Sequence, residues 1–243
     1  MVDRIIHAVS ISGGKDSTAT LCYALETQPP ESVRAVFADT GNEHDLLYEY
    51  LDYLEDALKI KIIRLRRDFS AEWEHRRQWL MGDQPRKDRK DRKAYTEAQI
   101  AKVLVVFERG PTGNPYLDLC IIKGRFPSRK AQFCTQFLKT EPLVEYQMSL
   151  LDSGECDAVW SWQGIRRDEG GRRAHAKEFE SLGGNLYVYL PIARWKAADC
   201  FNAMRACGIK PNPLYSLGFD RVGCMPCVNS GKTDILNMAK RFP

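Results

Sequence analysis

A glycine-rich hexapeptide near the start of the chain follows an apolar run, Ile5 to Ile11, and precedes an amphipathic run, Thr18 to Leu25. Its residues are Ser12, Gly13, Gly14, Lys15, Asp16 and Ser17. The order of the three segments predicts a strand, a tight turn and a helix N-terminus. Two glycines let several backbone N–H groups point to one place, and the helix dipole and Lys15 add positive charge there. The hexapeptide therefore predicts a site for nucleotide phosphates, with a purely steric turn as the alternative.

Strand-like and helix-like segments alternate along the rest of the chain. Apolar runs that suit buried strands cover Ile5 to Ile11, Val33 to Ala38, Lys61 to Leu65, Ala158 to Gly164 and Leu186 to Ile192. Helical spacing covers residues 17–26, 46–58, 69–81, 94–107, 134–151 and 197–206, with a short final helix. This alternation predicts an α/β fold: a mostly parallel five-stranded sheet with helices on both faces. Residues 82–92 are predicted to be flexible, and residues 111–127 to form an irregular connection.

Polar residues follow two more of the predicted strands. Asp39 and Thr40 end the second, and Gly164 and Arg166 end the fourth. Because ligands of open α/β sheets bind at the carboxyl ends of the strands, we expect these residues to converge with the hexapeptide. Arg166 could hold a phosphate or sulfate with its forked guanidinium, and Asp39 and Thr40 could bond a base, a ribose or Mg²⁺. A helix N-cap is the alternative for Asp39 and Thr40.

Further charged residues follow Arg166. A surface salt-bridge loop is the alternative interpretation of Arg167, Asp168 and Glu169, while Arg172 and Arg173 could extend a positive wall.

Two of the eight cysteines form a Cys-x-x-Cys motif, Cys224 and Cys227. Thiols this close provide half of a tetrahedral metal site or a redox pair. Cys134 and Cys207 are the candidates for two further ligands. The remaining cysteines are predicted to be buried or inert, with Cys200 in reserve as a ligand; they are Cys22, Cys120 and Cys156.

Length and charge set further bounds. A chain of 243 residues with 44% hydrophobic content can bury one substantial core. The net charge is +4, with basic runs at residues 64–67, 86–93 and 123–130, so a phosphate-bearing partner or solvated loops are the two interpretations. No apolar run reaches the length of a membrane span and the start is unlike a signal peptide, so we expect a cytoplasmic protein without membrane contact.

The hexapeptide is not a Walker loop, which has four residues between its glycines. It resembles the PP-loop of the N-type ATP pyrophosphatases, and from Ile5 to about Lys232 the chain resembles the phosphoadenosine phosphosulfate (PAPS) reductase family. This resemblance implies an adenine nucleotide α-hydrolase-like fold with the first strand near the middle of the sheet. It also implies ATP, PAPS or adenylyl sulfate as the nucleotide, Mg²⁺ near Asp16 or Asp39, and catalytic roles for Lys15, Asp16 and Arg166. The family's second signature matches Gly164 to Arg173, with Gly170 where a serine is usual.

The cysteine arrangement is similar to that of iron–sulfur members related to DNA phosphorothioation and their phage homologues. The resemblance implies a 4Fe–4S cluster held by Cys134, Cys207, Cys224 and Cys227, with zinc as the alternative metal. Basic residues near the ligands would offset the thiolate charge; they are Arg129, Lys130, Lys139 and Arg221. We divide the chain into a nucleotide-binding domain, 1–207, and a metal-binding segment, 208–243, packed on it.

Three functions are consistent with these features. The first is an enzyme that binds ATP, carries an iron–sulfur cluster and adenylates or transfers sulfur to a nucleic acid or small acceptor. The second is a sulfonucleotide reductase that releases sulfite, although the family's Glu-Cys-Gly-Leu-His motif does not occur in this sequence. The third is a non-catalytic nucleotide-binding subunit of a larger assembly. Acceptor, partner subunit and oligomeric state do not follow from the sequence.

Overall fold

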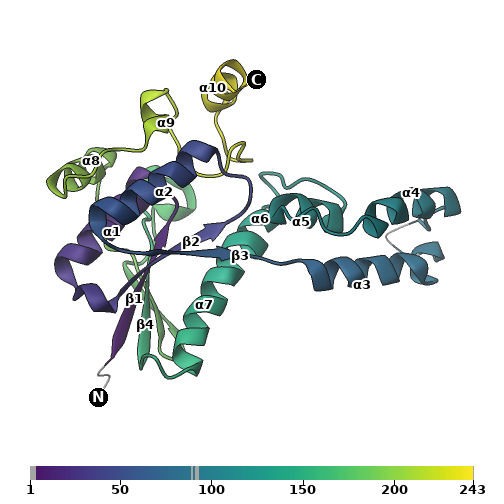
Figure 1. Ribbon diagram of the computed structural model, residues 1–243, viewed down its shortest axis with the longest axis horizontal. Coiled ribbons are helices and arrows are strands. Elements are labelled where there is room, and N and C mark those ends of the chain that lie inside the picture. The colour runs from purple at the N-terminus through teal and green to yellow at the C-terminus, as the bar shows by residue number, and fades with distance from the viewer. Residues whose placement is uncertain (1–3, 89, 91–92, 243) are drawn as a thin grey trace.

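The computed structural model describes residues 4–88, 90 and 93–242, without the side chain of Arg172. Within these residues six strands form one sheet in the order β3-β2-β1-β4-β6-β5 (Figure 1). The strands are β1 (Ile5–Ile11), β2 (Val33–Asp39), β3 (Ile62–Arg66), β4 (Ala158–Trp162), β5 (Phe179–Gly183) and β6 (Leu186–Tyr189). Every neighbouring pair is parallel except β5 with β6. The predicted α/β class with a mostly parallel sheet is confirmed.

The first strand lies in the middle of the sheet and is covered on both faces. The covering helices are α1 (Lys15–Thr27), α2 (Asp45–Leu58), α7 (Glu141–Asp152) and α8 (Ala197–Ala206). Successive residues of a strand point to opposite faces. Val9 and Ile11 accordingly pack in the core that includes α1, α2 and α8, whereas Ile6 and Ala8 pack in the core that includes α7. Burial on both faces explains why this strand is a continuous apolar run.

The sixth strand, β5, was not expected. Its five residues are all exposed, so their sequence lacks the apolar pattern of a buried strand. A hairpin turn connects it to β6, and Gly183, Gly184 and Asn185 in this turn all have positive φ. A Gly-Asn pair is a common hairpin turn, so the turn residues were the available signal for β5.

Three helices form an arm that projects from the sheet (Figure 1). They are α3 (Ser70–Met81), α4 (Glu97–Glu108) and α5 (Pro115–Lys123). Trp73, Leu80 and Phe107 are buried between α3 and α4, and Trp73 Nε1 donates a 3.0 Å hydrogen bond to the carbonyl oxygen of Phe107. The predicted flexible stretch 82–92 lies at the tip of the arm; residues 84–86 form a short 3-10 helix, and residues 89, 91 and 92 lie outside the described residues.

The prediction of an irregular connection over residues 111–127 is wrong, because α5 lies within it. The residues that suggested irregularity are the ones that begin and end the helix. The Asn114 side chain accepts a hydrogen bond from Leu117 N at 3.1 Å, and Pro115 occupies the first turn, where its missing N–H costs nothing. Gly124 ends the helix in the left-handed conformation, with φ 65°.

The remaining helices are short or irregular. They are α6 (Phe133–Thr135), η3 (Gln136–Thr140, a π-helix), α9 (Pro213–Ser216), α10 (Lys232–Arg241), and the 3-10 turns η1 (Pro30–Ser32), η2 (Gln84–Arg86), η4 (Arg167–Glu169) and η5 (Gly171–Arg173). The helix predicted over 134–151 therefore contains a π-helical stretch before α7. In the described part of the chain, no helix combines the length and apolar character needed to cross a bilayer.

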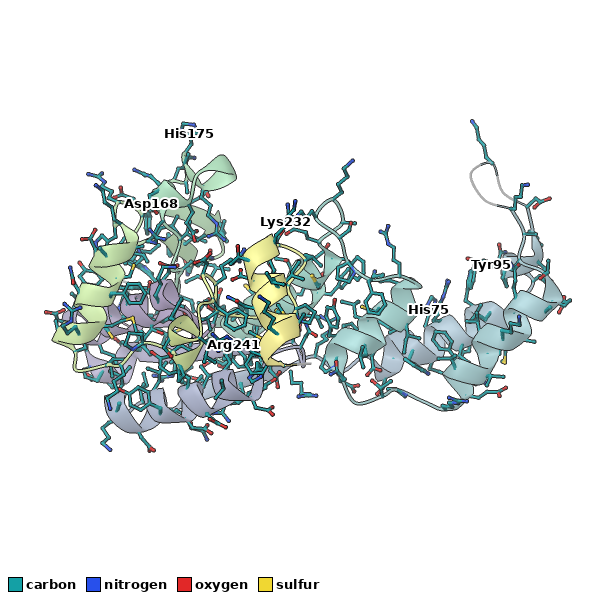
Figure 2. The ribbon with its side chains drawn as sticks, turned by 90° about the horizontal axis from the view of Figure 1, so that it is seen from above. His75, Tyr95, Asp168, His175, Lys232 and Arg241 are labelled. Atoms are coloured by element: carbon teal, nitrogen blue, oxygen red, sulfur yellow. The ribbon has the colours of Figure 1, made fainter. Side chains whose placement is uncertain are left out.

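The C-terminal segment lies beyond the carboxyl ends of the strands. Figure 2 labels Lys232 and Arg241, which mark the two ends of α10 near the base of the arm. The Asn212 side chain donates to the carbonyl oxygen of Gly13, and Met225 N donates to the carbonyl oxygen of Asn42 at 2.6 Å. The segment thus contacts the loops at the sheet edge, while the division of the chain at residue 207 stays a prediction.

A buried histidine gives the fold a pH dependence. Trp162 Nε1 donates a 3.0 Å hydrogen bond to His7 Nδ1, and burial lowers the pKa of His7 below its usual 6.5. Below pH 6.5 the unfolded chain therefore binds this proton more readily than the folded chain, and stability falls as the pH falls. We expect the melting temperature to decrease between pH 7 and pH 5.5, and His7→Gln to reduce that decrease. An equal pH dependence in both proteins would contradict this role for His7.

Candidate nucleotide site and cysteine cavity

The hexapeptide forms a compact loop between β1 and α1. Gly13 has a φ of 69°, a backbone conformation that favours glycine. Ser17 Oγ accepts from Ser12 N at 3.1 Å and donates to the carbonyl oxygen of Gly14 at 3.0 Å, which closes the turn. Tyr215 Oη accepts from Lys15 N at 2.8 Å. The loop is therefore held both by its own hydroxyls and by the C-terminal segment.

A carboxylate is held behind this loop. Arg166 Nε lies 2.6 Å from Asp16 Oδ1, and the same guanidinium pairs with Asp168. The Cys200 thiol donates to Asp16 Oδ1 at 3.3 Å, and Lys15 Nζ lies 3.4 Å from Asp16 Oδ2. Arg166 is only 4% exposed, so it is committed to Asp16 and Asp168 rather than extended toward solvent. In this structure Arg166 fixes the base of the loop.

Two adjoining cavities lie at the carboxyl ends of β1 and β4. The smaller, about 120 Å³, is lined by the loop residues Ser12 to Ser17 except Gly13 and by cations from three other places. The larger, about 330 Å³, is lined by β1, β2 and β4 and by η3 and α7. The residues common to both are Ser12, Ser17, Gly164 and Arg173. Strand order reverses between β1 and β4, which is where open α/β sheets bind ligands.

The smaller cavity concentrates positive charge. Lys15, Arg173 and Arg221 line it. The pKa of Arg173 is lowered by partial desolvation and by the positive charge of Arg221. Such a cluster of cations next to helix-terminal N–H groups favours an anion with several charges. Arg173, which was expected to extend a positive wall, does line this cavity, and the Arg172 side chain lies outside the described part of the structure.

Gly164 brings β4 into direct contact with the loop. A Cβ atom at this position would lie 2.8 Å from Asp16 C and 2.9 Å from Ser17 N. Real Cβ atoms are not found this close to backbone, so the approach depends on glycine. Gly164 therefore sets the spacing between the two walls of the smaller cavity.

Asp39 and Thr40 lie at the end of β2 as predicted, with protein partners. Asp39 Oδ1 accepts from Tyr48 Oη at 2.7 Å, and Asp39 Oδ2 lies 2.9 Å from Arg66 NH1. Thr40 Oγ1 donates to Glu43 Oε1 at 2.7 Å. The N-cap of the following helix is His44, so neither residue has the capping role that was the alternative. Both instead stabilise the turn after β2.

Residues that the sequence did not single out complete the larger cavity. Glu43 and Lys139 lie on its rim, and Gln147 Nε2 donates a buried 2.9 Å hydrogen bond to Ser161 Oγ in its wall. Lys139 belongs to the π-helical stretch η3, and such stretches are frequent at functional sites. Glu43 follows the expected turn by two residues, but nothing in its sequence context marked it.

Three of the four predicted metal ligands line one small cavity of about 30 Å³; they are Cys134, Cys224 and Cys227. The Cys224 thiol donates to Glu43 Oε1 at 3.4 Å, and the pKa of Lys139 is raised by the nearby Cys224 thiolate against the opposing effect of burial. Lys139 lines both this cavity and the larger nucleotide cavity. The cysteine cavity therefore adjoins the candidate nucleotide site.

The fourth predicted ligand is elsewhere. Cys207 is exposed at the end of α8, where it interacts with Cys22, and the reserve ligand Cys200 bonds Asp16. Among the described residues, no three His, Cys, Asp or Glu side chains are placed to hold one metal ion. The cluster ligand set that included Cys207 does not fit this arrangement, because the fold directs the end of α8 toward α1.

The predicted Mg²⁺ neighbours are also engaged. Asp16 and Asp39 each accept from an arginine side chain. Neither carboxylate is left without a cationic partner, so the residues as placed do not form the expected Mg²⁺ site.

The glycine-rich loop after a central parallel strand, together with cavities at the strand ends, defines an α/β protein with the Rossmann-like adenine nucleotide α-hydrolase fold. A solved structure of a PAPS reductase from Candida auris shares this fold, with a TM-score of 0.50, 15% sequence identity, and coverage of 91% of this chain and 81% of that one. A family model described as the phosphoadenosine phosphosulfate reductase domain matches residues 6–105 and 120–230. The chain belongs to this family.

Relatives extend the comparison. An uncharacterized 37.8 kDa protein of Escherichia phage 186 is 42% identical over 99% of this chain and 72% of its own length. An uncharacterized protein of Methanocaldococcus jannaschii is 27% identical over 97% of this chain but 38% of its own length. An adenosine 5'-phosphosulfate reductase of Mesorhizobium japonicum is 34% identical over 54% of this chain and 41% of its own length. The chain thus spans less than half of the last two relatives.

Proposed function

We propose that this chain is an enzyme of sulfur metabolism that binds an adenine nucleotide, with its phosphates in the smaller cavity and its base and ribose in the larger one. The observation that carries the proposal is the continuity of the two cavities around Ser12, Ser17 and Gly164. The cations and loop N–H groups suit a polyphosphate, while the mixed apolar and polar walls of the larger cavity suit a purine.

We further propose that the nucleotide is ATP and that the reaction is adenylation followed by sulfur transfer. An acceptor nucleophile attacks the α-phosphorus, the bond from that phosphorus to the bridging oxygen breaks, and pyrophosphate leaves. Lys15, Arg173 and Arg221 stabilise the negative charge of the leaving group, because they surround the cavity where it develops. Arg166 positions the loop through Asp16 and does not touch the nucleotide.

Sulfonucleotide reduction is the second candidate, because named relatives are adenosine 5'-phosphosulfate reductases. Such a reaction takes a sulfonucleotide at the same site and releases sulfite. The larger cavity and the adjoining thiols accommodate this chemistry as well. The two functions differ in their products and in the nucleotide that they consume.

A product assay separates the candidates. Anaerobically prepared protein is incubated with ATP and, separately, with adenylyl sulfate and PAPS plus a dithiol reductant, and pyrophosphate and sulfite are both measured. Pyrophosphate from ATP supports adenylation, and sulfite supports the reductase. Nucleotide binding without either product would contradict an enzymatic role and favour a nucleotide-binding subunit.

We propose a nucleic acid as the acceptor, on the basis of the charge of the arm. Residues 70–130 contain 14 Lys and Arg against 8 Asp and Glu, whereas the rest of the chain contains 22 against 24. The excess positive charge is thus confined to the projecting part of the molecule (Figure 2), where labelled His75 and Tyr95 lie. A basic projection favours a polyanionic partner.

The arm makes a testable prediction. We expect affinity for duplex DNA to fall steeply with salt, and the double variant Lys87→Glu, Lys90→Glu to weaken binding and reduce the salt slope by about 1 for each phosphate that the arm no longer binds. Both lysines are exposed near the tip. Lys61→Glu, an exposed lysine outside the arm, is the matched control. Fluorescence anisotropy at several salt concentrations measures the effect, and equal weakening by both variants would rule out a specific role for the arm.

A further inference from the structure

The cysteine cavity has a fourth thiol beside it, at a position that the sequence pattern favours for core packing. Cys120 lies on α5, one helical turn after Tyr116, so both side chains are on the same face of that helix. Tyr116 lines the cysteine cavity together with Cys134, Cys224 and Cys227. Cys120 is 7% exposed and hydrogen-bonds the Tyr116 side chain. It therefore faces the cavity from behind the tyrosine.

The electrostatics of Tyr116 show how the thiols are grouped. Burial raises the pKa of Tyr116 to about 12, and negative charge on Cys120, Cys134, Cys224 and Cys227 contributes to the increase. Burial and the charge of Cys134 likewise raise the pKa of Cys120 to about 11. Charges act this strongly only at short range. Four thiols from three parts of the chain thus surround one phenol ring.

We propose that Cys120 is the fourth thiolate of a metal centre, with Cys134, Cys224 and Cys227, and that this centre is an iron–sulfur cluster. The set replaces Cys207, which lies beside Cys22. This inference goes beyond the proposed function and does not depend on it, because the metal ligands are separate from the phosphate loop.

The surroundings of the four thiols suit a negatively charged centre. Lys139 is buried beside Cys224. Lys123 Nζ lies 3.9 Å from the centre of the Phe137 ring, and Arg125 lies 5.6 Å from the Phe133 ring, which places two more cations next to the helix that carries Cys134. Cations near a four-thiolate centre offset its charge.

Loading the centre requires one rearrangement. The thiols surround Tyr116 instead of a shared point, and the cavity has only about 30 Å³ of free volume. The Tyr116 side chain must therefore turn aside for the thiols to meet one metal centre. Tyr116→Phe keeps the ring but removes the hydroxyl that bonds Cys120, so we expect this variant to retain the metal.

Metal content tests the inference. The protein is reconstituted anaerobically with ferrous iron and sulfide, and iron, acid-labile sulfide and zinc are measured per chain with the visible absorption spectrum. We expect Cys120→Ser and Cys120→Ala to lose the iron and sulfide to the same extent as Cys224→Ser. Cys207→Ser and Cys156→Ser should retain the wild-type amounts; Cys156 is the matched buried control, since it packs in a different core.

Two further measurements keep loss of metal distinct from loss of fold. Thermal unfolding and ATP affinity of the Cys120 variants should stay close to those of Cys156→Ser. Wild-type metal content in both Cys120 variants, metal loss in Cys207→Ser, or a wild-type protein that takes up no metal would each overturn the proposal. Zinc held by the same four residues would support the ligand set and overturn the iron–sulfur assignment. Failure of ATP binding alone would contradict the proposed function and leave the metal result intact.

Discussion

Lys15→Ala is expected to weaken ATP binding by roughly ten- to 150-fold. Lys15 is largely buried at the mouth of the smaller cavity, with its ammonium 3.4 Å from Asp16 Oδ2 and 5.8 Å from the centre of the Tyr215 ring. Hydrogen bonds to charged groups contribute about 1.5 to 3 kcal/mol, which corresponds to that range of affinity. Arg166 still holds Asp16 in the variant, so the loop itself should persist.

Adenosine is the internal control for this prediction, because it lacks the phosphates. Calorimetry should show weaker ATP binding in Lys15→Ala but nearly the same adenosine affinity. Lys61→Ala, at an exposed lysine before β3, should match the wild type for both ligands. Equal weakening of ATP and adenosine would show that Lys15 supports the fold or the base instead of the phosphates.

Gly164→Ala is expected to damage both stability and binding. The new methyl group would overlap the backbone of Asp16 and Ser17, which cannot rotate away as a flexible side chain could. Overpacking of this kind costs about 1 to 3 kcal/mol. For a chain of this length each kcal/mol lowers the melting temperature by about 2 to 4 °C. The loop must also shift, so nucleotide affinity should fall further than the stability loss alone predicts.

Gly231→Ala is the matched control. A Cβ atom at Gly231 meets nothing within 4 Å, and the backbone φ there is −70°, which alanine adopts readily. Differential scanning fluorimetry and calorimetry on the two variants measure the effects. Wild-type stability and affinity in Gly164→Ala would mean that β4 does not press against the loop as described.

The sequence predicted most reliably what depends on local chemistry. The phosphate loop, the central strand and most helices follow from glycine placement and apolar period, which neighbouring residues determine. The same signals misled at α5, where Pro115 and Gly124 begin and end a helix although their pattern predicts an irregular connection. The exposed edge strand β5 carries no apolar signal at all.

Site residues that depend on tertiary contacts were harder to place. Arg166 was expected to clamp a phosphate, but its buried pairing with Asp16 joins residues 150 apart in the chain. Cys207 has suitable spacing to Cys224, yet α8 carries it to Cys22 and away from the cavity that Cys134 lines. Cys120 approaches the cysteine cavity only because α5 packs beside α6. Sequence spacing cannot report contacts that the fold alone creates.

The central claim is that the two joined cavities at the ends of β1 and β4 form one adenine-nucleotide site. Isothermal titration of the well-folded wild-type chain with ATP, adenylyl sulfate and PAPS tests it most directly. We predict saturable one-site binding of at least one of these nucleotides, with adenosine competing for the same site. The absence of binding heat with all three nucleotides would contradict the claim.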